Sequence, residues 1–254
     1  MLSLSNNNDN NSMNRAFVYG DLLFESIKVS GGMPQFLTLH YNRLMQSAQI
    51  LKFETDLSIE TFEQIVNDTI TQSSLKEARV RFVMHRNAEG FYTPSNNQTL
   101  IFTEIFPLVF ASNNILTLGV YTDNYKPCTE LSSIKSGNAL LCVMAGIFAN
   151  ENGFDDSLIL NEHGCVCEAT SSNIFMVKNE KVYTPALTEG CVAGVMRHHI
   201  LEQLRNADYE VQETVVTLEQ LLDADAIFLT NAIRGVMHVG FIGNKEFKIS
   251  AIHA

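Results

Sequence analysis

The sequence predicts an α/β (α+β) protein with two domains. Its 254 residues are 46% apolar and 18% charged, so the chain can bury a sizeable core. Stretches in which apolar residues alternate, as in strands, and stretches in which they recur at helical spacing occur in both halves of the chain. The pattern pauses at residues 111–114. We therefore expect a smaller N-terminal α/β domain at residues 15–112 and a larger C-terminal domain at residues 113–254.

The N-terminal half is predicted to mix strands and helices. Aromatic and β-branched side chains surround Gly20-Asp21, which predicts two strands or one bent strand there. Ser58 is a suitable N-cap for a helix, and apolar residues alternate with Arg79 and Arg81 as in a strand. The predicted elements are strand structure within 16–29, helices at 39–51 and 58–70, strands at 78–85 and 100–110, and a loop at 87–98.

The C-terminal half has the same two kinds of pattern and no internal repeat. The predicted elements are a strand at 115–121, a helix at 138–150, strands at 157–160, 165–169 and 174–177, a helix at 195–207, and a strand at 226–230.

The charge balance bears on the partners of this chain. Its formal net charge is -11, which argues against nucleic acid and against an anionic membrane, because both reward clustered lysine and arginine. The longest apolar stretch, residues 139–149, is too short to span a bilayer. A small anionic molecule is still compatible with this charge, because a few local basic groups can hold one.

The N-terminus and the cysteines indicate a cytoplasmic protein. Residues 1–14 are rich in Asn and Ser and have no basic start and no apolar core, so we expect a disordered leader and no signal peptide. The five cysteines form no C-x-x-C pair and are expected to be reduced thiols. Cys165 and Cys167 share one strand face, but no second ligand cluster supports a metal site there, so none is assigned.

Two charged residues are candidates for chemistry. Lys135 follows a polar loop and precedes Ser136-Gly137-Asn138 and an apolar helix. Alone, such a lysine is usually a solvated surface residue, whereas a catalytic one needs a site that lowers its pKa. Glu168 lies in a run of mostly uncharged residues and needs a partner. That partner is either a structural cation or the protonated pyridine nitrogen of a cofactor.

Two further segments are suited to bind a phosphate. Gly194-Val195-Met196-Arg197 reads as a glycine-bearing turn into a helix, whose first N–H groups attract anions, although most such turns only cap a helix. Arg43, on the helix predicted at 39–51, is the second candidate, and otherwise reads as a surface arginine.

The order of these segments resembles the class IV aminotransferase family, over roughly residues 17–239. Of the matching segments, the one that begins at Glu168 is the most specific. The matching segments are Tyr19-Gly20-Asp21 with Phe24-Glu25, His40-x-x-Arg43-Leu44, Lys135-x-x-Asn138, Glu168-Ala169-x-Ser171-Ser172-Asn173-Ile174-Phe175, Thr184-Pro185 and Gly194-Val195-Met196-Arg197. The resemblance implies fold type IV, with pyridoxal phosphate (PLP) held between a smaller N-terminal and a larger C-terminal domain, and a homodimer as the usual unit.

The resemblance also implies roles for individual residues. It makes Lys135 the lysine that binds PLP covalently and acts as general acid/base, and Glu168 the partner of the pyridine nitrogen. Arg43 and the backbone N–H groups of Val195 and Met196 would hold the phosphate, and Asn231 is expected to bind the cofactor as well. The family often has Ile-Thr where this chain has Val195-Met196, so a hydroxyl contact is lost.

Three features favour 4-amino-4-deoxychorismate lyase among the family members. Asn138 is followed by Ala139, whereas branched-chain aminotransferases usually have Asn-Tyr there. Ser26 stands where those enzymes usually have Gly, and Asn231-Ala232 resembles the corresponding segment of lyases. The lyase would release pyruvate and form 4-aminobenzoate, a step of folate biosynthesis.

The alternatives are a branched-chain or D-amino-acid aminotransferase and, in a different class, a non-catalytic PLP-binding scaffold. Ile134-Lys135-Ser136-x-Asn138 also looks like D-amino-acid aminotransferases, whereas a scaffold needs neither Lys135 nor Glu168. All the catalytic readings require a small amino substrate. We expect Arg86 and the loop at 89–94 on one wall of its pocket, with Tyr19, Phe24 and Ser26 opposite.

Overall fold

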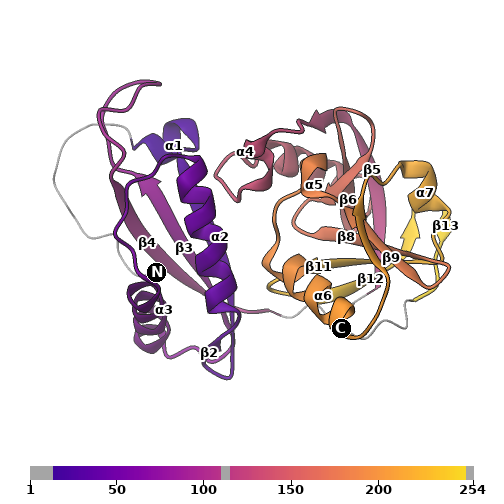
Figure 1. The fold of residues 1–254 in the computed structure, drawn as a ribbon, viewed down its shortest axis with the longest axis horizontal. Helices are drawn as coiled ribbons and strands as arrows, with labels where there is room; N and C mark the ends of the chain where they lie inside the picture. The colour runs from indigo at the N-terminus through magenta and orange to yellow at the C-terminus, as the bar shows by residue number, and fades with distance from the viewer. Residues whose placement is uncertain (1–13, 110–114, 250–254) are drawn as a thin grey trace.

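The computed structural model describes residues 14–109 and 115–249 and contains two sheets side by side (Figure 1). The predicted boundary at 112/113 and the predicted leader fall outside the described residues, apart from Asn14. In the described part of the chain, no helix is long and apolar enough to cross a membrane.

The small sheet is antiparallel and has the order β2-β1-β3-β4. Helices α2 and α3 cover one of its faces, and side chains such as Phe62 and Phe82 are fully buried between the layers. Ser58 caps α3 as predicted, because its side chain accepts a hydrogen bond from the N–H of Thr61. The elements of this half are α1 (Arg15–Tyr19), β1 (Leu22–Ser30), β2 (Met33–Pro34), α2 (Leu37–Ile50), α3 (Ile59–Ser73), β3 (Ala78–Arg86) and β4 (Thr99–Pro107).

The strand structure predicted within 16–29 is correct only for β1. Its first residues form the short helix α1, whose N-terminus is capped by the Asn14 side chain at 2.9 Å from the N–H of Ala16. Gly20 ends this helix at φ 65°, a left-handed conformation that glycine adopts without strain. Local capping therefore overrides the β propensity of the aromatic residues.

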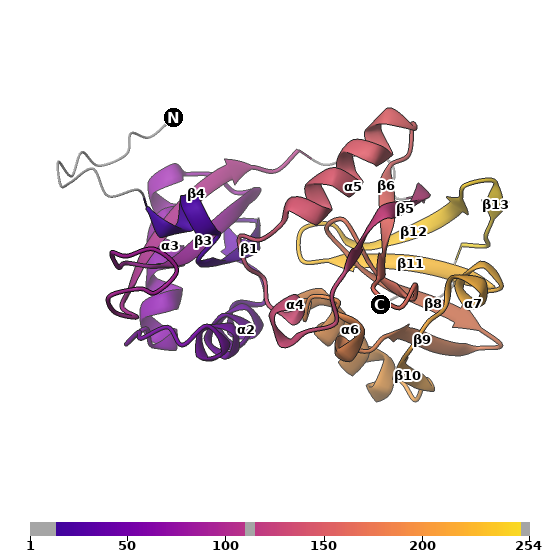
Figure 2. The same cartoon turned by 90° about the horizontal axis from the view of Figure 1, so that it is seen from above.

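The large sheet has nine strands in the order β10-β9-β8-β11-β12-β5-β6-β7, with β13 paired to β12. The sheet curls, so that β7 also contacts β8. Helix α5 packs on β5 and β6, and α6 packs on β11 and β10 (Figure 2). The elements are β5 (Ile115–Lys126), α4 (Glu130–Ser133), α5 (Leu140–Glu151), β6 (Asp156–Asn161), β7 (Val166–Ala169), β8 (Asn173–Lys178), β9 (Lys181–Pro185), the 3₁₀ turn η1 (Leu187–Glu189), α6 (Val195–Asn206), β10 (Val211–Thr214), α7 (Leu218–Leu222), β11 (Ala226–Asn231), β12 (Gly235–Ile242) and β13 (Lys245–Glu246).

The two halves are joined by backbone hydrogen bonds along the free edge of β1. The N–H of Phe24 donates to the carbonyl of Lys135 at 3.0 Å, and the N–H of Gly137 donates to the carbonyl of Leu22 at 3.1 Å. Because Lys135 belongs to the large half, this pairing holds it against the small sheet. Helices α2 and α6 also meet across the junction, where the rings of Phe36 and His199 lie 4.7 Å apart.

Candidate functional site

A cavity of about 750 Å³ lies where the two halves meet. This size is typical of a site for a small molecule or a cofactor. Residues from both sheets line it, including β1 and β3 of the small half and β7, β11 and the start of α6 of the large half. Seven of the residues singled out from the sequence line the cavity together with Lys135: Phe24, Ser26, Arg43, Glu168, Val195, Met196 and Asn231.

Lys135 projects from the segment that pairs with β1. Its Nζ lies 4.4 Å from the centroid of the Phe24 ring. Burial and the neighbouring Arg43 guanidinium lower the pKa of Lys135 to about 8, although Glu25 and Glu168 oppose this shift. A lysine with such a pKa has an appreciable neutral fraction near physiological pH, so it can act as a nucleophile or a base.

A buried charge cluster holds Arg43 at the cavity edge. Glu25 on β1 accepts hydrogen bonds from His40 Nδ1 at 2.6 Å and from Arg43 Nε at 2.8 Å, and from a second Arg43 nitrogen. Arg43 also donates to the carbonyl of Ala193 at 3.2 Å, just before α6. The guanidinium is therefore fixed by both halves of the molecule and is not the surface group that the sequence alone allowed.

Glu168, on β7, has two donors in the structure. Lys126, at the end of β5, forms an ion pair with one carboxylate oxygen. The backbone N–H of Val192 donates to the other oxygen at 2.8 Å. Glu168 as a whole is 4% exposed, so its carboxylate needs such partners. Of the two partners expected from the sequence, a structural cation or a cofactor nitrogen, the structure contains the cation, and Glu168 still lies at the cavity wall.

The start of α6 forms a cradle for an anion. The first N–H groups of a helix have no partner within the helix, and here Val195 and Met196 occupy the first two helical positions. Gly194, before them, leaves no room for a side chain, because an added Cβ would lie 1.9 Å from Oδ1 of Asn173. Asn173 in turn donates to the carbonyl of Val192 at 2.8 Å, which fixes the loop.

Thr230, near the end of β11, was not selected from the sequence. Its Oγ1 is buried without a hydrogen-bond partner among the described residues, and the residue lines the cavity. An unpaired buried hydroxyl is costly unless a ligand completes it. Asn231 beside it is already engaged, since its Oδ1 accepts from the N–H groups of Ile233 and Arg234 and its Nδ2 donates to Ser172.

Two residues expected at the substrate pocket lie elsewhere. Arg86 is buried and is committed to Asp21 at 2.9 Å, to the carbonyl of Leu51 at 2.8 Å and to Asn97. Tyr19 lies on α1, where its ring contacts that of Tyr92. Neither lines the cavity.

Arg79 and Arg81 supply positive charge to the cavity wall instead. They alternate along β3 with the fully buried Val80 and Phe82, so they point away from the core. In the sheet register, Arg81 lies opposite Ser26. The alternation of apolar and basic residues along β3 already indicates that Arg79 and Arg81 lie on the face opposite the core.

The amino-transferase class IV family model matches residues 22–242. The chain belongs to the class IV aminotransferase family. It is 31% identical to the aminodeoxychorismate lyase of Vibrio harveyi over 242 residues, covering 92% of this chain and 88% of the relative. It is 26% identical to the branched-chain-amino-acid aminotransferase of Escherichia coli strain K12 over 231 residues, covering 86% and 75%.

The fold agrees with the family. A crystal structure of a Legionella pneumophila protein, provisionally named 4-amino-4-deoxychorismate lyase, superimposes with a TM-score of 0.90 at 25% identity, covering 97% of this chain and 92% of that one. The predicted fold type IV architecture is therefore confirmed. As a class IV aminotransferase-family member, the chain is a PLP-dependent enzyme of the lyase or transaminase kind.

The residues at the cavity fit this cofactor. Its dianionic phosphate suits the start of α6 together with Arg43, and the unpaired hydroxyl of Thr230 is a further donor to it. Glu168 is suited to the ring nitrogen and Lys135 to covalent attachment. When bound, PLP supplies an electron sink that acidifies the α-proton of an amino substrate.

Proposed function

We propose that this chain is an aminodeoxychorismate lyase that releases pyruvate and leaves 4-aminobenzoate. The observation that carries the proposal is the cationic wall formed by Arg79 and Arg81 beside Ser26. The lyase substrate is a cyclohexadiene that carries a carboxylate on its ring and a second one on its side chain. Two guanidinium groups at the pocket wall suit this dianion, even though Arg81 also lies 3.8 Å from the partly exposed Glu104, whereas an aliphatic amino acid side chain needs an apolar wall.

The side chains of the cavity divide the work in this proposal. Lys135 removes the α-proton of the amino-bearing carbon and later returns a proton, since its lowered pKa lets it serve as both base and acid. Glu168 keeps the ring nitrogen of the cofactor protonated, and Arg43, Val195, Met196 and Thr230 bind the phosphate. The side chains at the cavity wall that would contact the substrate are Phe24, Ser26, Arg79 and Arg81.

A parallel assay tests the reaction. Purified holoenzyme is supplied with aminodeoxychorismate, and pyruvate and 4-aminobenzoate are measured. Separate reactions with L-Leu, L-Ile, L-Val or D-Ala and a keto-acid acceptor are followed by keto-acid formation. Equimolar pyruvate and 4-aminobenzoate are expected. Efficient turnover of L-Leu without any reaction of aminodeoxychorismate would replace the lyase by a branched-chain aminotransferase, the second candidate, which is favoured by the E. coli relative.

Substitution of the cationic wall tests the basis of the proposal. Arg81→Gln removes a charge-assisted contact to a carboxylate, so kcat/KM for aminodeoxychorismate should fall roughly 10- to 100-fold, mainly through KM. Arg205→Gln is the matched control, because Arg205 is an exposed arginine on α6 outside the cavity. An Arg81→Gln enzyme with parental KM would remove the support for a dianionic substrate.

We also infer that the functional unit is a homodimer. Helix α5 exposes an apolar stripe at positions i, i+3, i+4 and i+7, formed by Leu140, Val143, Met144 and Ile147. β4 also exposes apolar side chains, Leu100, Phe102 and Phe106, which lie an even number of residues apart and so share one face of the strand. Contiguous exposed apolar faces of this kind are usually covered by a partner.

The mass in solution tests the dimer. Light scattering should give twice the chain mass of 28.4 kDa. Ile147→Glu should shift the protein toward monomer, whereas Val215→Glu, at an exposed apolar residue outside both faces, should not. A monomeric parent protein would refute the inference.

A further inference from the structure

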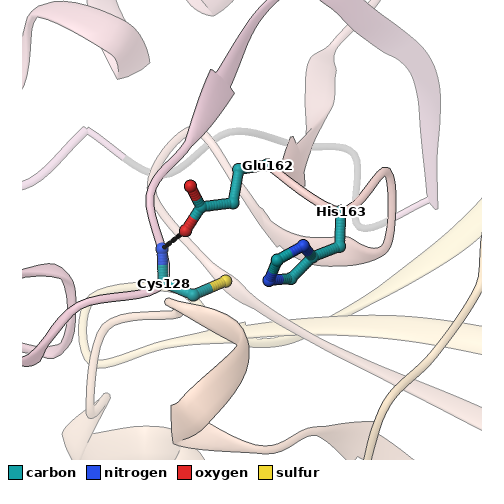
Figure 3. Close-up of side chains that lie close together, drawn as sticks. All are labelled: Cys128, Glu162 and His163. Carbon is teal, nitrogen blue, oxygen red and sulfur yellow. Dashed lines mark hydrogen bonds between the residues drawn. The ribbon is translucent and has the colours of Figure 1, made fainter.

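Three side chains with metal-binding atoms come together outside the cavity (Figure 3). Cys128 lies in the segment between β5 and α4, and Glu162 and His163 lie in the turn between β6 and β7. The Cys128 Sγ, a carboxylate oxygen of Glu162 and a ring nitrogen of His163 are all within 4.8 Å of one another. Figure 3 shows the thiol and the imidazole pointing toward each other.

Hydrogen bonds hold both segments in place. Glu162 Oε1 accepts from the backbone N–H of Cys128 at 2.7 Å, which ties the two segments together. The buried Asn161 accepts from the N–H groups of His163 at 3.1 Å and Cys165 at 2.9 Å, and its Nδ2 donates to Glu189 at 2.9 Å. Asn161 therefore fixes the shape of the turn before any ligand binds. Residues that hydrogen-bond to metal ligands commonly play this role at metal sites.

The surroundings of Cys128 favour a cation over a reactive thiolate. The Glu162 and Glu189 carboxylates lie near the Cys128 thiol and make its surroundings negative. Reactive cysteines need the opposite, a positive environment. A negative environment stabilises a bound dication, so the cluster is suited to a metal and not to nucleophilic chemistry.

We propose that Cys128, Glu162 and His163 bind a divalent transition-metal ion of the Zn²⁺ class. Thiolate, imidazole and carboxylate are the three ligand types that Zn²⁺ takes in proteins, and a thiolate disfavours Mg²⁺ and Ca²⁺. Tetrahedral bonds of about 2.0–2.3 Å place ligand atoms roughly 3.3–3.6 Å apart. The three ligand atoms lie within 4.8 Å of one another, so the exposed side chains of Glu162 and His163 would need to move roughly 1 Å inward to reach this spacing. Water fills the fourth position.

The binding step releases one proton. The Cys128 sulfur forms a bond to the metal as its S–H bond breaks, and the proton goes to solvent. Glu162 and His163 donate lone pairs without a change in oxidation state. A carboxylate oxygen has more than one lone pair, so Glu162 keeps its hydrogen bond to the Cys128 N–H while it binds the ion.

The ion would be structural. Cys128 follows Lys126 by two residues, and Lys126 pairs with Glu168 at the cavity. Pro127 and Thr129, on either side of Cys128, line the cavity itself. A metal that joins Cys128 to the β6–β7 turn would thus fasten the cavity wall from behind, and it should stabilise the folded protein.

Titration of the holoenzyme with ZnCl₂ tests the proposal. The protein is first dialysed against a chelator, and binding is measured by calorimetry in buffers of different ionisation enthalpy. One Zn²⁺ per chain, about one proton released and a higher melting temperature are expected. Cys128→Ser and His163→Gln should each weaken binding by more than the roughly 10- to 100-fold typical of losing an outer-shell partner.

The control is His198→Gln. His198 is also an exposed histidine beside a carboxylate, 3.4 Å from Glu202, but among the described residues it belongs to no group of three metal-binding side chains. This variant should bind Zn²⁺ like the parent. If Cys128→Ser fails to fold, the surface variants His163→Gln and Glu162→Gln decide the question. Absence of Zn²⁺ binding by the parent, or parental affinity in His163→Gln, would overturn the proposal.

Discussion

Replacing Glu25 by glutamine tests the buried charge cluster that orients Arg43. Burial by itself would raise the pKa of Glu25, but Arg43 and His40 outweigh it and lower the pKa from 4.5 to about 2. At roughly 1.4 kcal/mol per pKa unit, the folded state gains about 3 kcal/mol from the ionised carboxylate. Glu25→Gln also leaves the Arg43 guanidinium, which is only 11% exposed, without its counter-charge.

The expected loss of unfolding free energy at pH 7 is about 3 kcal/mol, at the lower end of the ~3–5 kcal/mol typical of breaking a buried pair. Urea denaturation followed by circular dichroism measures it. Glu210→Gln is the matched control, since Glu210 pairs with Lys181 at 2.9 Å on the surface. The unfolding free energy of this variant should hardly differ from that of the parent, because exposed ion pairs contribute little.

The pH dependence gives an independent check. A carboxyl group with a depressed pKa in the folded state stabilises it above the unfolded pKa, and this stabilisation is lost as the pH falls through the folded pKa. The difference between parent and Glu25→Gln should therefore be full above pH 4.5 and shrink toward pH 2. A loss below 1 kcal/mol at pH 7, or a difference that stays constant down to pH 2, would refute the electrostatic argument.

Four further substitutions separate function from stability. Lys135→Met should abolish turnover and the visible absorbance band of the covalently bound cofactor. It should also raise the unfolding free energy of the cofactor-free chain at pH 7 by up to about 3 kcal/mol, because a folded-state pKa of about 8 instead of 10.5 makes the buried ammonium costly below pH 8. An unchanged unfolding free energy would contradict this. Glu168→Gln should lower kcat about 100-fold or more and should also lower the melting temperature, because it leaves the largely buried Lys126 without its counter-charge; activity within a few-fold of parent would exclude its catalytic role. Lys126→Met should destabilise the cofactor-free protein by ~3–5 kcal/mol, because Glu168 loses its buried counter-charge. The holoenzyme should lose less, because the protonated ring nitrogen of the cofactor replaces the lost cation. Urea denaturation of both forms measures the difference. Thr230→Val should leave the cofactor-free protein as stable or more so, while cofactor affinity, measured by fluorescence titration, drops roughly tenfold; equal affinity would show that the hydroxyl has another partner.

Secondary structure was predictable where local chemistry decides it. The alternation at 78–85 predicts β3, and Ser58 predicts the start of α3, because each pattern depends only on residues that are close together in the sequence. The same reasoning was wrong at the start of 16–29. There the capping groups Asn14 and Gly20 turn a β-prone sequence into a helix.

The candidate site was predictable in part because the order of its motifs is typical of one family. Lys135, Glu168 and Arg43 are far apart in sequence, and the structure brings all three to one cavity. The position of Arg86 was not predictable. Its neighbours along the chain do not reveal that Asp21, reached only through the β1–β3 pairing, neutralises it and keeps it out of the cavity.

The sequence by itself determined the family and the fold type, because those depend on residue types at fixed positions along the chain, and it predicted candidate residues for the cofactor. Only the tertiary structure decided which cations form buried ion pairs, as Arg86 does, and which line the cavity, as Arg81 does. It also decided that Cys128 meets Glu162 and His163 across more than 30 residues of chain. Charge, hydrogen bonding and metal binding act over a few ångströms in space, so the groups that a side chain meets are set by the packing of distant segments.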